Sequence, residues 1–188
     1  MQLRRKFLET GAIAATNYVQ VGHRREAIEY ALAGIKRHHD AVLEAFGHDP
    51  FSLEMEGTMR AWVAETLLQG AYLREYHLWE KDCKAYFPEM AQRNGDTLVM
   101  KKKPRQPFTA LVWDMLARFS VAVSPNITSA IETMRSRVNV MKHEAGLELD
   151  HFISEADYIA GVEALEEFWN HLASAEAVAC RERRRGAI

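Results

Sequence analysis

Cysteine, proline and glycine are scarce in this 188-residue chain, and each scarcity excludes some kinds of site or fold. The two cysteines, Cys83 and Cys180, lie far apart and match no metal-ligand spacing, so they predict free thiols in a reducing cytoplasm. Only five prolines and ten glycines interrupt a sequence rich in alanine, glutamate, leucine and arginine, which favours an all-helical fold. The formal net charge of −2 gives no global basic field, so any nucleic-acid surface would have to be local.

Long apolar runs are absent as well. No stretch approaches the roughly 18 apolar residues of a membrane span. Residues 3–8, LRRKFL, resemble the core of a twin-arginine export signal, but the apolar run behind them soon gives way to Thr16, Asn17 and Gln20. Residues 1–22 are therefore predicted to form an N-terminal arm or a short first helix. The motifs of phosphate-binding loops, dinucleotide-binding folds, zinc proteases and serine hydrolases are missing too.

Apolar residues recur at alternating steps of three and four along most of the chain, which is typical of amphipathic helices. The predicted helices cover 23–46, 52–87, 108–121, 124–146 and a long C-terminal segment that starts at Ser154. The fold class is therefore an antiparallel bundle of about five helices, in one domain spanning residues 1–188. Residues 94–107 form the one long irregular stretch, a basic loop that contains Lys101–Arg105. We expect a solvated loop there, with contact to a phosphate backbone as the alternative.

Two features of the second predicted helix bear on the core. Methionine and aromatic residues form a stripe along it, and such stripes are usually core, so we expect burial of Met55, Met59, Trp62, Tyr72, Tyr76, Trp79, Cys83 and Tyr86. Gly70 lies in the middle of this helix and predicts a kink or a close approach of another helix. His77 is the residue outside the stripe with the most chemical interest.

Metal sites find little support in the sequence. His38 and His39 are adjacent but have no second ligand cluster, and we expect His39 to be half buried at a helix interface. A carboxylate-bridged metal bundle needs two Glu-x-x-His pairs, and this chain has one, Glu148 to His151. No metal or other cofactor is therefore predicted, although a weak alternative joins His38, His39 and His77.

The stretch 124–146 holds the best functional clue. Ser124 can cap a helix with Pro125 in its first turn, and Gly146 can stop it. Its apolar spine is predicted to be buried and consists of Ile127, Ile131, Met134, Val138, Met141 and Ala145. Polar and cationic side chains then decorate the flanks near its C-terminal end: Arg135, Arg137, Asn139, Lys142 and His143. The helix macrodipole alone also favours cations at such an end.

This cluster resembles the HEPN superfamily of small helical domains, many of which are metal-independent ribonucleases. The family mark is an arginine followed, after four to six residues, by a histidine near the end of a helix, as in Arg137-Val-Asn-Val-Met-Lys-His143. The likeness covers about residues 125–172. Many members place a polar residue directly after the arginine, whereas this chain has Val138 there and Asn139 one residue later.

The resemblance implies an endoribonuclease of toxin–antitoxin or phage-defence type, acting as a homodimer on RNA and restrained by an antitoxin protein. It assigns catalysis to Arg137, His143 and Asn139, and phosphate contact to Lys142 and Arg135. Inactive members are known as a class, so a non-catalytic module for dimerisation or for binding a partner or nucleotide is the alternative.

Helical geometry leaves open whether Arg135 or Arg137 pairs with His143. At about 100° per residue, Arg135 and His143 fall on one flank of the spine and Arg137 on the other. Arg137 pairs with His143 only if the helix end unwinds or a second subunit brings its own motif across. Arg135 is otherwise the better companion of His143.

Overall fold

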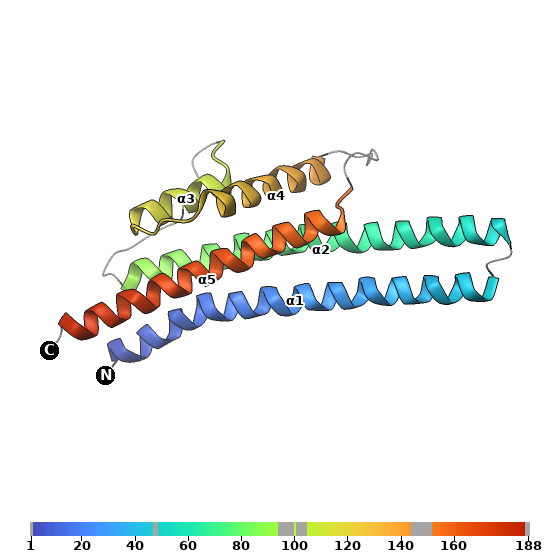
Figure 1. Cartoon of the computed structure of the whole chain (residues 1–188). Helices are drawn as coiled ribbons and strands as arrows, with labels where there is room; N and C mark the ends of the chain where they lie inside the picture. The colour runs from blue at the N-terminus through green and yellow to red at the C-terminus, as the bar shows by residue number, and fades with distance from the viewer. Residues whose placement is uncertain (1, 47–48, 94–99, 101–104, 144–151, 187–188) are drawn as a thin grey trace.

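The computed structural model describes residues 2–46, 49–93, 100, 105–143 and 152–186 (Figure 1). Within these ranges it has five helices and no strand: α1 (Gln2–Phe46), α2 (Pro50–Arg93), α3 (Phe108–Arg118), α4 (Pro125–His143) and α5 (Glu155–Gly186). The predicted all-α fold of about five helices is therefore confirmed. None of the described helices combines the length and the apolar character needed to cross a bilayer.

A long antiparallel hairpin of α1 and α2 is the frame of the molecule (Figure 1). α5 packs along the half of this hairpin that lies nearest the chain termini, against both α1 and α2. α4 lies over α2 and α5, and α3 lies beside it in the same outer layer. The other end of the hairpin, drawn in cyan, projects beyond α4 and α5 with no third helix on it.

Several helix boundaries differ from those predicted. Residues 1–22, expected as a separate arm or short helix, belong from Gln2 onward to the 45-residue helix α1. Pro88, expected to end α2, lies inside it. The neighbouring Tyr86, Phe87 and Ala91 are fully buried, and their packing offsets the roughly 3 kcal/mol that an interior proline costs. α3 ends at Arg118, three residues before the predicted end.

Side-chain caps fix where three of the helices begin. Asp49 accepts hydrogen bonds from the backbone N–H groups of Phe51 and Ser52 at 3.3 and 3.2 Å at the start of α2. The Ser124 hydroxyl accepts one from the backbone N–H of Ile127 at 3.4 Å, as predicted for α4. At α5 the Ser154 hydroxyl accepts from the Asp157 N–H at 3.1 Å, while the Asp157 carboxylate accepts from the Ser154 N–H at 3.2 Å. The two side chains thus form a reciprocal capping box.

Aromatic side chains fill the core where α2, α3 and α5 meet. The Trp79 ring lies 5.9 Å from Phe108 and 5.5 Å from Phe168, both edge-on, measured between centroids. Trp113 lies 6.2 Å from Phe168, and Trp169 lies 5.2 Å from it. Edge-to-face pairs of this kind add to the stabilisation that burial alone provides. These aromatic contacts hold α3, which lies beside α4 in the outer layer, against α2 and α5.

The methionine and aromatic stripe of α2 is core along only half of its length. Its C-terminal members are buried as predicted: Tyr72, Tyr76, Trp79, Cys83 and Tyr86. Its N-terminal members Met55, Met59 and Trp62 are 50%, 55% and 67% exposed, so that part of the prediction was wrong. They lie on the projecting end of the hairpin, where no helix of the outer layer covers α2.

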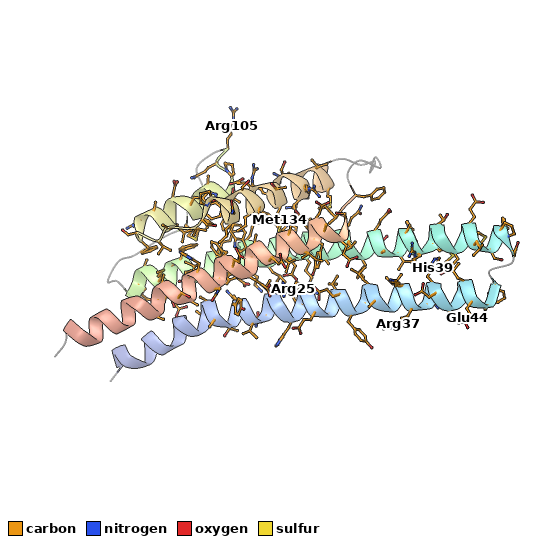
Figure 2. All side chains as sticks on the ribbon, viewed as in Figure 1. Arg25, Arg37, His39, Glu44, Arg105 and Met134 are labelled. Atoms are coloured by element: carbon orange, nitrogen blue, oxygen red, sulfur yellow. The ribbon has the colours of Figure 1, made fainter. Side chains whose placement is uncertain are left out.

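The close helix approach occurs at a different glycine from the one predicted. Nothing lies within 4 Å of where a Cβ of Gly70 would be. A Cβ on Gly161 of α5 would instead lie 2.9 Å from the Tyr72 ring and 3.5 Å from the Met134 sulfur. Gly161 therefore lets α5 approach α2 and α4 closely, beside the labelled Met134 in Figure 2.

Candidate functional site at the end of α4

The apolar spine of α4 holds the candidate site against the core. Ile131, Met134 and Val138 are fully buried, and Ile127 is 7% exposed. The residues between these positions consequently emerge on two flanks, one towards α2 and the other towards α5. The cations of the predicted site are divided between these flanks.

Arg137 lies on the flank towards α5. Its Nη1 atom is 2.5 Å from Oδ2 of Asp157, in the first turn of α5. This contact raises the pKa of Arg137 and lowers the pKa of Asp157. Tyr72 of α2 is close enough to feel the same arginine, although burial dominates and raises the pKa of its hydroxyl to about 12. Arg137 is thus tied to the helix that follows it.

Arg135 emerges on the other flank and is engaged by α4 itself. Its Nε atom donates to Oε2 of Glu132 at 2.7 Å. The Trp113 indole of α3 donates to the second oxygen of the same carboxylate at 3.0 Å. Partial burial acts to raise the pKa of Glu132, but the hydrogen bonds that it accepts outweigh burial and lower it. Arg135 therefore helps to join α4 to α3.

Lys142 lies on the α2 side, near His77. The pKa of His77 is lowered first by partial burial and then by the positive charges of Lys142 and Lys84, against the opposing effect of Glu80. The Lys84 ammonium itself lies 4.8 Å from the centroid of the Phe108 ring. The exposed Lys142 of α4 and the exposed Lys84 of α2 thus both bring positive charge towards His77.

The helix is continuous through His143, its last residue. The position of the His143 side chain is outside the described residues, as are Ala145 and Gly146. Because α4 does not unwind before this point, Arg137 and His143 start from opposite flanks of one regular helix. The pairing of these two residues stays a prediction, and within a single chain this geometry favours Arg135. Asn139 is half buried and lies on the same flank as Arg135.

Sequence reasoning missed the partners of the two arginines. The position of Asp157, three residues after Ser154, is typical of a capping residue at the start of α5. Its contact with Arg137 depends on how α5 packs against α4. The contact of Glu132 with Arg135 follows an i,i+3 spacing and could have been found. Trp113 belongs to another helix and left no signal in the sequence.

The histidines considered as metal ligands lie apart from this site. His39 Nδ1 lies 3.7 Å from Oε1 of Glu56, between α1 and α2 on the projecting hairpin (Figure 2). The described ranges contain no group of three His, Cys, Asp or Glu side chains that could hold a metal ion. Glu148 and His151 lie outside those ranges, as does most of the basic run 101–105. Its described member, Arg105, is exposed and points away from α3 (Figure 2).

A hollow of about 460 Å³ lies where α5 begins. Leu32 and Ile35 of α1, Ala61 and Ala64 of α2, and Glu155 of α5 contribute to its walls. It continues the groove between α1 and α2 that α5 fills from this point onward. The hollow therefore lies just beyond the N-terminal end of α5.

Comparison with known proteins identifies no relative. No protein-family model, curated protein or solved structure matches the chain. The link to the HEPN superfamily accordingly remains a resemblance carried by the residues of α4.

Proposed function

We propose that this protein is a metal-independent endoribonuclease of the HEPN type, with its site at the C-terminal end of α4. The observation that supports this most is the gathering of Lys142, Lys84 and His77 where α4 ends over α2. The C-terminal end of a helix carries partial negative charge, which repels phosphate. Local cations are needed to overcome that repulsion, and this surface provides them although the chain as a whole is slightly acidic.

The chemistry follows from the residue types. An imidazole titrates near neutral pH, so His143 can remove the proton from a ribose 2′-hydroxyl as that oxygen attacks the adjacent phosphorus. Arg137 has five N–H donors and uses one arm on Asp157, so the rest of its guanidinium can reach phosphate oxygens. Asn139 orients the histidine or the phosphate, while Lys142 and Arg135 add positive charge. By the resemblance, the products carry a 2′,3′-cyclic phosphate and a 5′-hydroxyl.

The biological role also comes from the resemblance. A ribonuclease of this kind is a toxin in a toxin–antitoxin or phage-defence system and needs a cognate antitoxin protein to restrain it. The protein acts as a homodimer in which two copies of the motif face each other. That arrangement lets Arg137 of one copy serve His143 of the other, which a single regular helix does not.

One observation favours a second candidate, a non-catalytic HEPN-like module that binds a partner or nucleotide. Arg137, the arginine that the motif spacing selects, is already neutralised by Asp157 within the chain. A carboxylate at that distance competes with a phosphate for the same guanidinium. In this case Arg137 joins two helices, and the exposed Lys142 contributes to binding alone.

An RNA cleavage assay in EDTA separates the two candidates. The ribonuclease proposal expects the wild-type chain to cleave RNA and His143→Ala to lose this activity while keeping its helical circular dichroism. His38→Ala, on α1 and outside the site, is the matched control and should cleave like wild type. Activity that persists in His143→Ala contradicts the assigned mechanism. A wild-type chain that binds RNA without cleaving it, and binds it less tightly as Lys142→Ala, supports the second candidate.

A further inference from the structure

The projecting end of the hairpin displays an apolar surface that the chain itself does not cover. Phe51, Met55, Met59 and Trp62 of α2, here called the α2 stripe, are 69%, 50%, 55% and 67% exposed. Monomeric proteins rarely leave large apolar side chains exposed in one continuous row. The α2 stripe is therefore a candidate surface for binding another protein chain.

The α2 stripe faces away from α1. At about 100° per residue its four members fall within about 80° of one another on the helix. Ala64 lies opposite the middle of the stripe and Glu56 lies about 100° from it. Glu56 meets His39 of α1, and Ala64 lines the hollow shared with Leu32. α1 consequently cannot cover the stripe.

The size of the stripe fits one half of a protein interface. With about 200 Å² for a large side chain, the exposed fractions of its four members amount to on the order of 500 Å². Two such surfaces facing each other would remove on the order of 1,000 Å² from water, close to the lower limit of about 1,200 Å² for specific interfaces. The side chains that flank the stripe would supply the remainder.

The order of residues in the stripe points to a second copy of this chain as the occupant. An aromatic residue stands at each end and a methionine at each of the two inner positions, so the order is the same in both directions. A two-fold axis through the middle of the stripe would place Phe51 of one copy by Trp62 of the other, and Met55 by Met59. A two-fold interface requires self-complementarity of this kind, and an unrelated partner does not.

We propose that two copies of this protein associate through their α2 stripes, packed antiparallel, so that the two α2 helices lie side by side between the two α1 helices. The contact extends for about 17 Å, the length of eleven residues of helix. The flexible methionines at its centre pack into the gaps that the facing helix leaves. This surface is separate from the residues assigned to RNA cleavage, so the dimer is an alternative to the homodimer with facing motifs that the resemblance implies, and the proposal does not depend on that activity.

Light scattering coupled to size exclusion tests the proposal on the full chain. The wild type should have twice the 21.5 kDa mass of one chain and should dissociate on dilution. Met59→Glu should give a monomer with unchanged helical circular dichroism, since the side chain is exposed and its loss leaves the core intact. Met55→Glu is the second variant and should behave alike. Tyr30→Glu makes the same change on α1, where Tyr30 is 75% exposed and outside the stripe, and should remain a dimer.

Cysteine cross-linking tests the antiparallel orientation. Met55→Cys and Met59→Cys are made in separate chains, each with Cys180 replaced by serine. Under oxidation the mixture should form a disulfide-linked dimer, because position 55 of one copy faces position 59 of the other, while neither variant alone should link efficiently. Linking of Met55→Cys to itself would indicate a parallel pairing or another register and overturn the proposed arrangement. A wild type that is monomeric at all concentrations, or a dimer that survives Met59→Glu, would overturn the interface itself.

Discussion

The Arg137 guanidinium lies 2.5 Å from the Asp157 carboxylate, which joins the last third of α4 to the first turn of α5. The same carboxylate accepts hydrogen bonds from the backbone N–H and the hydroxyl of Ser154. One acidic side chain therefore caps α5 and holds the arginine that the motif spacing selects. Any catalytic use of Arg137 must operate with this contact in place or exchange it for a phosphate.

The two roles of Asp157 can be separated by a pair of variants. Ser154→Ala removes the hydroxyl that caps α5 and should reduce the free energy of unfolding by about 1 kcal/mol at neutral pH. Asp157→Asn keeps an acceptor for the cap but removes the charge that pairs with Arg137. Because both partners are about one-third exposed, this loss should be below about 1 kcal/mol in urea unfolding at neutral pH.

The pH dependence of these variants provides the control. The pKa of Asp157 is lowered from its ordinary value of 3.8 in the folded state, so the folded chain holds this proton less readily than the unfolded chain. The stabilisation is complete above pH 3.8 and is lost as the pH falls through the lower pKa of the folded state. Asp157→Asn should lack this part of the acid destabilisation, and Ser154→Ala should keep most of it. Identical acid profiles for wild type and Asp157→Asn would contradict the assignment.

Two glycines should respond oppositely to alanine. Gly161→Ala places a methyl group 2.9 Å from the Tyr72 ring and should lower the free energy of unfolding by about 1–3 kcal/mol through overpacking. Gly70→Ala meets open space in the same kind of helix and should raise it by up to about 1 kcal/mol through helix propensity. Thermal and urea unfolding of both variants check the prediction. A stabilising Gly161→Ala would mean that α5 does not approach α2 as closely as described.

His77 should titrate below pH 6.5 because it is partly buried and near two lysines. Lys142→Gln should raise its pKa towards 6.5, as measured by NMR of the imidazole C–H signals. Lys36→Gln, on the projecting hairpin, is the control and should leave the pKa unchanged. Since the folded-state pKa is lowered, protonation of His77 disfavours the folded state, and stability from this residue is lost as the pH falls below 6.5. An unchanged pKa in Lys142→Gln would separate His77 from the end of α4.

A charged pair in the α1–α2 interface should matter more than its surface counterparts. The Arg24 Nε atom lies 2.6 Å from Oε1 of Glu75, whose side chain is 3% exposed. Glu75→Ala leaves Arg24 without its partner in a largely buried position and should reduce the free energy of unfolding by about 3 kcal/mol. Glu29→Ala removes a more exposed partner, 3.6 Å from Arg25, and should change it by less than about 0.5 kcal/mol. Equal decreases in the free energy of unfolding in the two variants would contradict the assignment of Glu75 as a buried charge.

The sequence by itself determined the helical fold and most of the buried spine of α4. In α4, Ile131, Met134 and Val138 repeat with helical spacing and are buried as predicted. The capping residues Ser124 and Ser154 were equally readable, because a cap depends on groups within four residues of it. Local chemistry and periodicity are contained in short stretches of the chain, so no knowledge of the fold was needed.

Only the tertiary structure decided what covers each apolar face. The periodicity of α2 is alike at Met59 and at Tyr76, but α5 begins too late along the hairpin to extend the bundle beyond the level of Ala61 and Ala64. Pro88 stays in its helix because the core packs around it, which no local propensity records. The contact of Arg137 with Asp157 likewise joins two helices whose packing sets the distance. Burial and ion pairing between elements depend on where each helix starts and stops relative to its neighbours, and a one-dimensional pattern does not contain those relations.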